Sequence, residues 1–183
     1  MVRKFSLLFT FASLAALAIA APASATGGAL IAPASVCPMQ GTLDAPAATQ
    51  ESAMLCMTDF ARAHAGLAEL STAEELEQSA GDKGDDILRC DSFSHFACGR
   101  EFTYWMRQTG YISSQCWRAG ENLAWGTDGY GTVRSIFRAW MNSPGHRENI
   151  LGDFNQIGIS VRIGALAGQP DTHIWAQHFG SHC

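Results

Sequence analysis

Apolar side chains between about residues 51 and 142 recur with the period of an α-helix. The clearest example is the stripe formed by Val133, Ile136, Phe137, Trp140 and Met141. This spacing puts the apolar side chains on one face of a helix, where they can pack on a core. The pattern predicts four helices, over about residues 51–65, from 71 or 72 to about 88, over about 100–108 and over about 132–142.

The second of these helices is expected to begin with a capping box. In that motif a Ser or Thr and a Glu three residues later satisfy each other's free backbone N–H groups. The pairs Ser71–Glu74 and Thr72–Glu75 fit the motif equally well.

Later in the chain the pattern changes to a period of two, which is typical of β-strands. In residues 156–163 Ile and Val alternate with smaller or polar residues, and residues 172–179 are rich in Trp, Ile, Phe and Thr. A loop with Gly and Pro joins the two segments, so we expect an antiparallel pair. Residues 121–125 are a third, weaker strand. Helices first and strands late indicate an α+β layered domain rather than a series of βαβ units.

The first 25 residues have the organisation of a secretory signal peptide. Arg3 and Lys4 precede an unbroken apolar run over residues 5–20, and Ala23-Ser24-Ala25 matches a small-residue cleavage site. The alternative is an uncleaved membrane anchor, but the run is shorter than the roughly 20 residues that span a bilayer. We therefore expect export, to the extracellular space or the periplasm, with a mature N-terminus at or near Thr26.

The next 25 residues, 26–50, are rich in Ala, Gly and Pro and have no amphipathic period. This composition predicts an extended leader, followed by one domain over residues 51–183. Cys37 lies within the leader and could attach it to the domain.

The overall composition is that of a globular chain. Hydrophobic residues make up 47% of the 183 residues, which is enough to fill a core, and the formal net charge is −5. An acidic chain without a basic block is a poor candidate for nucleic-acid binding. No later apolar run has the length of a membrane span, so we expect no membrane span after signal cleavage.

The six cysteines show no C-x-x-C spacing, so neither a redox pair nor a zinc ribbon is indicated. In an exported protein we expect all six to be oxidised. Sequence does not select one set of pairs; the pair that we expect is Cys98 with Cys116, which would tie the 93–95 segment to the 121–125 strand.

Common catalytic motifs are absent from the sequence. It contains no G-x-S-x-G, no H-E-x-x-H and no glycine-rich phosphate loop after a strand. Three polar segments stand out instead, because each places polar side chains beside Gly, Pro or Cys. They are Phe93-Ser94-His95, Gly120-Glu121-Asn122-Leu123 and residues 143–151, SPGHRENIL.

These segments, followed by IGIS and HIWAQHFG, resemble the bacterial secreted branch of the CAP superfamily, the cysteine-rich secretory, antigen 5 and pathogenesis-related class 1 proteins, also called SCP domains. The resemblance covers about residues 51–183. It implies a three-layer α–β–α sandwich with a central antiparallel sheet and an open cleft. In many members that cleft holds two His and two Glu, and in some it binds a divalent metal.

Residue by residue, the resemblance implies a binding cleft of His95, Glu121 and His146, with His95 and His146 as candidate ligands for a divalent ion such as zinc. Ser143 stands where other members have the second glutamate, and Glu148 could substitute for it. Asn122 is expected to cap nearby backbone. His178 is expected to be a satisfied or exposed histidine without a role in the site.

Two functions remain open from the sequence. The first is a secreted binding or interaction module for an extracellular ligand or protein. The second is a metal-assisted or acid–base hydrolase of an extracellular or cell-envelope polymer, since two imidazoles and one carboxylate resemble a catalytic zinc set. Convergence of His95, Glu121 and His146 around an open position would favour hydrolysis. A Glu121 that binds backbone amides would favour the binding module.

Overall fold

A computed structural model describes residues 30–113 and 116–182. The predicted signal peptide and the first residues of the leader therefore lie outside the described part. In chain order the elements are α1 (Ala47–His64), β1 (Ser71–Thr72), α2 (Glu74–Arg89), η2 (Ala97–Gly99), α3 (Thr103–Gln108), β2 (Trp117–Gly126), η3 (Asp128–Tyr130), α4 (Val133–Asn142), α5 (Pro144–Ile150), β3 (Gln156–Leu166) and β4 (Gln169–His182). No helix among these described residues is long and apolar enough to cross a membrane.

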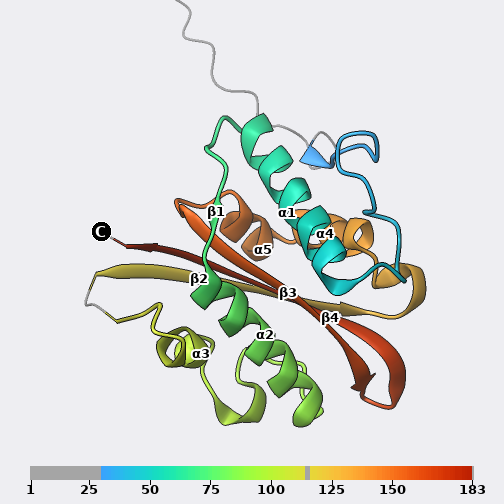
Figure 1. The fold of residues 1–183 in the computed structure, drawn as a ribbon, viewed down its shortest axis with the longest axis vertical. Helices are drawn as coiled ribbons and strands as arrows, with labels where there is room; N and C mark the ends of the chain where they lie inside the picture. The colour runs from blue at the N-terminus through green and yellow to red at the C-terminus, as the bar shows by residue number, and fades with distance from the viewer. Residues whose placement is uncertain (1–29, 114–115, 183) are drawn as a thin grey trace, which may run out of the picture.

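The strands form one sheet in the order β1-β3-β4-β2 (Figure 1). The predicted antiparallel pair is confirmed as the long β3–β4 hairpin, and β2 pairs antiparallel with the other side of β4. Two-residue β1 alone runs parallel to its neighbour, β3. The sheet therefore has β1 and β3 near one edge and β2 at the other.

Helices cover both faces of this sheet, with α1, α4 and α5 on one side and α2 and α3 on the other (Figure 1). Alternate residues of β4 explain why both faces are covered, because successive side chains of a strand point to opposite faces. Trp175 and Phe179 pack with α1 and α4, whereas Ile174 and Ala176 pack with α2. The expected α–β–α sandwich is confirmed.

The predicted apolar stripe of α4 is the centre of the larger core. Trp140 and Phe137 are at most 1% exposed and pack with Met54 and Met57 of α1. Trp105, by contrast, is only half-buried, and its indole N–H donates to the carboxylate of Asp86 at 2.7 Å.

The start of α2 differs from the expectation. Ser71 and Thr72 do not cap the helix; they pair with β3, and Ala73 occupies the N-cap position without a side-chain hydrogen bond. The capping-box prediction was wrong because both polar residues serve in a strand. The negative charges of the three Glu side chains in the first turn of α2 still stabilise the helix, because they lie at the positive end of its dipole.

Part of the predicted leader packs on the domain. Helix α1 begins at Ala47 rather than near residue 51, and Leu30 and Ala32 belong to the buried core. The buried amide of Gln40 donates to the carbonyls of Ala32 and Cys37, at 3.2 and 2.8 Å. Residues 30–46 are therefore an ordered part of the fold.

Disulfides join Cys37 to Cys56 and Cys90 to Cys98. The first attaches the segment before α1 to α1 itself, as the position of Cys37 suggested. The second makes the expected Cys98–Cys116 pair wrong, although Cys116 is also disulfide-bonded. Cys98 is only eight residues from Cys90, so the bridge closes a short loop after α2 rather than linking two distant segments.

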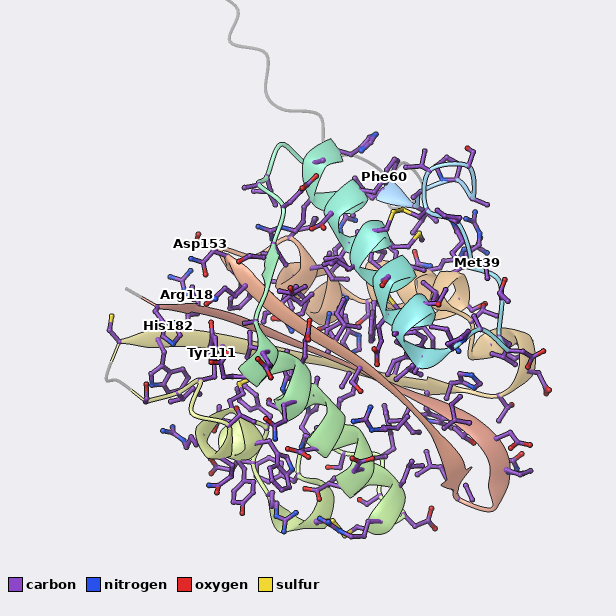
Figure 2. All side chains as sticks on the ribbon, viewed as in Figure 1. Met39, Phe60, Tyr111, Arg118, Asp153 and His182 are labelled. Carbon is purple, nitrogen blue, oxygen red and sulfur yellow. A yellow bond between two sulfur atoms is a disulfide. The ribbon has the colours of Figure 1, made fainter. Side chains whose placement is uncertain are left out.

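The chain segments near the end of β4 are tied by polar contacts (Figure 2). The Nε2 of His182 lies 2.8 Å from the carbonyl oxygen of Tyr111, and the centroids of the two side-chain rings are 4.5 Å apart. On the neighbouring strand Arg118 forms an exposed ion pair with Asp153 at 2.6 Å.

The backbone of α2 lies against the sheet at Gly158 of β3. A Cβ atom at this position would lie 2.0 Å from the carbonyl carbon of Leu76 and 2.2 Å from the amide nitrogen of Glu77. Both are backbone atoms that cannot rotate away. Gly158 therefore sets how near α2 lies to the sheet.

We expect Gly158→Ala to lower the free energy of unfolding by about 1–3 kcal/mol or more, because the added methyl forces α2 away from β3. Urea denaturation measures this change. Gly129→Ala is the matched control, since no atom lies within 4 Å of its added Cβ, and its effect should stay within about 0.5 kcal/mol. Equal stability of the two variants would contradict the close approach.

Candidate functional site

The carboxylate of Glu121 joins two histidines from different parts of the chain. Its Oε1 accepts a hydrogen bond from Nδ1 of His95 at 2.5 Å, and its Oε2 accepts one from Nε2 of His178 at 2.9 Å. His178 is the direct partner of Glu121 in the β2–β4 register, whereas His95 lies in the loop between α2 and α3. The side chain of Glu121 is 2% exposed.

Helix α2 completes the surroundings of this carboxylate. Lys83 is fully buried, with its Nζ 3.9 Å from Oε2 of Glu121. The hydroxyl of Ser79, one turn earlier, is hydrogen-bonded to Nδ1 of His178. An ionised carboxylate only accepts, so Nε2 of His178 carries the proton of this hydrogen bond. We call Ser79, Lys83, His95, Glu121 and His178 the Glu121 network.

The network keeps Glu121 ionised. Burial of the carboxylate would raise its pKa, but the hydrogen bonds from His178 and His95, together with the charges of His178 and Lys83, outweigh burial and lower the pKa to about 2. The same hydrogen bond raises the pKa of His95 above its usual 6.5. Desolvation lowers the pKa of Lys83, and the nearby charges of Glu121 and Asp86 partly offset this effect.

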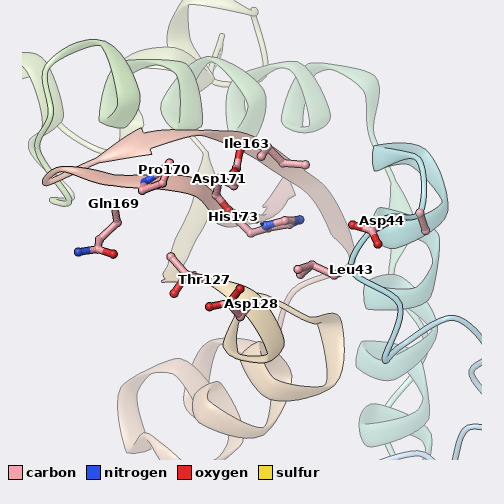
Figure 3. Close-up of a pocket in the computed structure, with 10 residues that line it drawn as sticks. Leu43, Asp44, Thr127, Asp128, Ile163, Gln169, Pro170, Asp171 and His173 are labelled. Atoms are coloured by element: carbon pink, nitrogen blue, oxygen red, sulfur yellow. Dashed lines mark hydrogen bonds between the residues drawn. The ribbon is translucent and has the colours of Figure 1, made fainter.

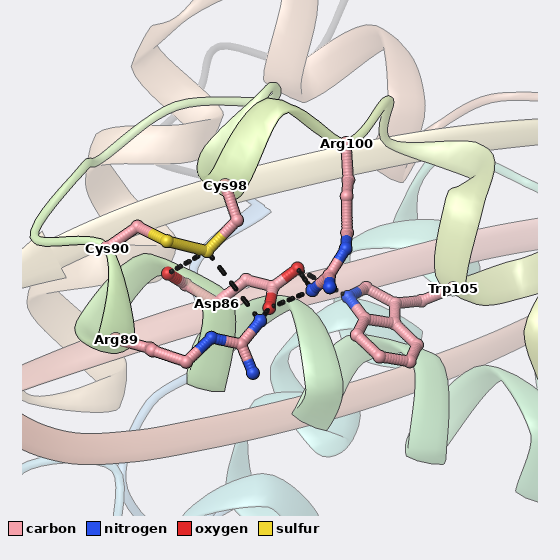
Figure 4. Close-up of a disulfide and its surroundings, with 6 residues drawn as sticks. All are labelled: Asp86, Arg89, Cys90, Cys98, Arg100 and Trp105. Atoms are coloured by element: carbon pink, nitrogen blue, oxygen red, sulfur yellow. Dashed lines mark hydrogen bonds and ion pairs between the residues drawn. A yellow bond between two sulfur atoms is a disulfide. The ribbon is translucent and has the colours of Figure 1, made fainter.

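The loop that carries His95 is fastened at three points. Cys90 and Cys98 close it covalently, Arg100 binds the buried carboxylate of Asp86 at 2.7 and 2.9 Å, and Nζ of Lys83 donates to the carbonyl of His95 at 2.7 Å. Figure 4 shows the disulfide next to the Asp86 side chain, with Arg89, Arg100 and Trp105 around that carboxylate. These contacts hold the Nδ1 of His95 against Glu121, while the imidazole stays 54% exposed.

His146 approaches β2 from the opposite layer of the sandwich. It lies on α5, and its carbonyl accepts a hydrogen bond at 3.1 Å from Nδ2 of Asn122. Asn122 is fully buried and also accepts from Nδ2 of Asn149 at 2.9 Å. The expected structural role of Asn122 is confirmed, and its partner is the backbone of the His146 helix. Neighbouring residues Glu121 and Asn122 thus hold one histidine on each side of the sheet.

The far end of α5 is held by a buried arginine. Nη1 of Arg62, near the end of α1, donates to the carbonyls of Ile150 and Gly152, and Nη2 donates to that of Phe154. These carbonyls lie at and just after the C-terminal end of α5, where C=O groups have no backbone N–H partner within the helix. Helix α5 was not predicted from the sequence, and it is fixed at both ends by side chains of other elements.

The outer edge of β2 is capped where the site lies. Nδ2 of Asn149 donates to the carbonyl of Glu121, and the indole N–H of Trp140 donates to the carbonyl of Leu123, both at 3.1 Å. We call the group of His95, Glu121 and His146 the β2-edge site. The two histidines flank this edge, and Glu121 is on the strand itself.

The structure therefore joins two of the three predicted residues directly. His95 and Glu121 are hydrogen-bonded, whereas no hydrogen bond of the described residues links the His146 imidazole to Glu121. Desolvation, and then the charge of His95, lower the pKa of His146 below 6.5. The two imidazoles therefore have pKa values shifted in opposite directions.

Two histidines of the β2-edge site are the residues that could act as metal ligands. A metal-ligating histidine usually donates its second ring N–H to a carboxylate, as His95 does to Glu121. This leaves Nε2 of His95 available, and His146 could supply a second imidazole. Within residues 30–113 and 116–182, no group of three or more His, Cys, Asp or Glu is arranged to hold a metal ion.

Exposed aromatic rings lie next to His95. Phe93 and Trp125 are 41% and 43% exposed, with an edge-to-face contact at 6.5 Å between ring centroids. Phe96, which follows His95, is 63% exposed. These rings give the β2-edge site an apolar border on the side of α2.

Three members of the Glu121 network, Ser79, Lys83 and His178, were not predicted from the sequence. Lys83 lies seven residues after Leu76 on the apolar stripe of α2, so a charge at a core position was the available signal. His178 follows Ile174 and Ala176 on one face of its strand. It was expected to be satisfied or exposed without a role in the site; it is satisfied, but its partner is Glu121 itself, so the second part of that expectation was wrong. Its contact with Glu121 depends on the β2–β4 register, and Ser79 gave no signal.

Comparisons with known proteins agree with this architecture. Residues 57–179 match the model of the cysteine-rich secretory protein family, CAP. The chain is 33% identical over 152 residues to the uncharacterized protein YkwD of Bacillus subtilis, covering 81% of this chain and 54% of that protein. It thus spans about half the length of this curated relative.

Solved structures of low sequence identity share the fold. An outer surface protein from Borrelia burgdorferi aligns with a TM-score of 0.58 at 20% identity, covering 71% of this chain and 90% of that one. An extracellular SCP-domain protein from Bacillus anthracis aligns with a TM-score of 0.57 at 19% identity, covering 73% and 40% of the two chains. The family model spans more than half of the chain, and the chain therefore belongs to the cysteine-rich secretory protein (CAP) family.

Proposed function

We propose that this protein is an exported binding module whose β2-edge site engages an extracellular ligand or protein. The observation that carries the proposal is the hydrogen bond between Nδ1 of His95 and the buried, ionised Glu121. It fixes the orientation of an exposed imidazole and leaves Nε2 for a partner. Exposed Phe93, Phe96 and Trp125 add apolar contact area of the kind that is enriched in interfaces.

A divalent ion such as Zn²⁺ is the inorganic partner that this donor set favours. Nε2 of His95 and the imidazole of His146 would be its ligands, with Glu121 orienting His95 from behind. Two protein ligands hold an ion weakly, so the remaining positions would belong to water or to the bound partner. The bound ion would supply a positive charge at the edge of β2.

The hydrolase interpretation is supported less well. It needs Glu121 as a metal ligand or as a proton donor. Both carboxylate oxygens instead accept hydrogen bonds from histidines, and Lys83 lies close behind. Among residues 30–113 and 116–182 no backbone amide donates to the Glu121 carboxylate, whose hydrogen-bond partners are the two imidazoles. A carboxylate with a pKa of about 2 is also a poor proton donor at neutral pH.

Export is supported by the two described disulfides, since these bonds persist in oxidising compartments. Solved neighbours are named as an outer surface protein and an extracellular protein. We expect mass spectrometry of the exported protein to find an N-terminus at Thr26 or within a few residues of it. A chain that retains Met1 or Val2 would instead indicate an uncleaved anchor.

We expect isothermal calorimetry at pH about 7.5 to detect reversible, weak Zn²⁺ binding that His95→Ala and His146→Ala each weaken at least about tenfold, since each removes one of two ligands. His64→Ala is the control, because His64 is an exposed histidine on α1, and it should bind as the wild type does. If both site variants bind like the wild type, the two histidines are not the ligands. If the wild type does not bind, the metal part of the proposal is wrong.

His95 and His146 are predicted to titrate on opposite sides of pH 6.5. In NMR the His95 ring should titrate above pH 6.5 and the His146 ring below it. A raised pKa means that the His95–Glu121 pair stabilises the fold fully below pH 6.5, and that this contribution is lost as pH rises through the pKa of His95. Zn²⁺ requires the neutral ring, so its affinity should rise over the same interval.

The control for this titration is Glu121→Gln. The variant should move the midpoint of His95 down toward 6.5, because the charged acceptor is gone. An unchanged midpoint for His95 in this variant would contradict the assigned hydrogen bond.

A further inference from the structure

A polar hollow lies at the end of the β3–β4 hairpin, away from the β2-edge site. This pocket, which we call the hairpin pocket, has a volume of about 510 Å³ and lies between the hairpin, η3 and the segment before α1 (Figure 3). His173 of β4 lines it. His173 is five residues before His178, so the two side chains point to opposite faces of the sheet, about 17 Å apart along the strand.

The hairpin pocket is acidic. Asp44, Asp128 and Asp171 come from three separate segments, and all three line it without being buried. None of its ten lining residues is Lys or Arg. The pocket therefore attracts cations, and the whole chain, with a formal charge of −5, does not oppose that attraction.

His173 supplies a second, independent indication of a ligand. The residue is 4% exposed, and its Nε2 has no hydrogen-bond partner among the described residues. Its Nδ1 lies 3.4 Å from the carbonyl oxygen of Asp171, which favours the tautomer with the proton on Nδ1. Nε2 is then a buried acceptor without a donor. Figure 3 shows the ring pointing from β4 toward Asp44 and Leu43.

Nε2 of His173 lacks a hydrogen-bond donor, and the three carboxylates favour a positive charge, so a cationic donor fits both. A primary ammonium carries three N–H donors, enough for Nε2 of His173 and the carboxylates. The apolar side chains of Leu43 and Ile163 border the same pocket and can contact an aliphatic stem, which favours an organic cation over a bare ion. We propose that the hairpin pocket binds a primary ammonium group on an aliphatic chain.

Such a group could belong to a lysine side chain or to a free diamine, and two probes separate these sources. We would titrate the mature chain with 1,5-diaminopentane and with Nα-acetyl-lysine methylamide, and follow ¹H–¹⁵N NMR spectra at low salt. Saturable shifts are expected at His173 and at the three aspartates. The tighter of the two probes identifies the source, and 1-pentanol, the uncharged analogue, should produce no saturable shift.

Variants at the pocket mouth test the charge. The double variant Asp44→Asn with Asp128→Asn should weaken binding at least about tenfold, because it removes two of the three carboxylates while the fold should persist at these surface positions. Asp153→Asn removes a charge elsewhere on the surface and should change the affinity less than about twofold. The NMR spectra themselves report whether each variant is folded.

Several results would overturn the proposal. These are the absence of saturable shifts with both amines, equal affinity in the double variant, and binding of 1-pentanol as strong as that of the amines. Shifts of the pocket residues with Zn²⁺ or Ca²⁺ but with neither amine would also overturn it, in favour of a metal site.

Discussion

The position of one buried carboxylate determines how the other functional groups are arranged. Glu121 is on an edge strand, yet its side chain is surrounded by His95, His178 and Lys83. An ionised carboxylate in such a place is stable only when several donors and positive charges compensate for lost hydration. Those donors come from a loop, a neighbouring strand and a helix, so satisfying one charge fixes the relative positions of three elements.

The residue after Glu121 extends this arrangement to the other face. Because successive strand residues point in opposite directions, Asn122 binds α5 while Glu121 binds the α2 layer. One dipeptide of β2 therefore couples both helical layers to the sheet. The histidines that flank the edge are held by different means, since Glu121 binds the ring of His95 and Asn122 binds the backbone of His146.

Local pattern was sufficient for much of the fold but not for the centre of the site. The stripe of α4 and the alternation of β3 are properties of short segments, and both predicted the correct element. Ser71 and Thr72 were misassigned because their pairing with β3 outweighs a local cap. The contact of His178 with Glu121 could not be predicted, since it depends on the register of two strands whose paired residues are 57 positions apart.

The hydrogen bonds at the outer edge of β2 also affect whether another chain can pair with this strand. A free edge strand is a template on which another chain can add by backbone pairing. Here Asn149 and Trp140 already occupy two carbonyls in the middle of the strand, so these two groups are not free to pair with the strand of a second copy. The exposed aromatic rings and imidazole therefore lie beside a strand whose central backbone groups are already bonded within the molecule.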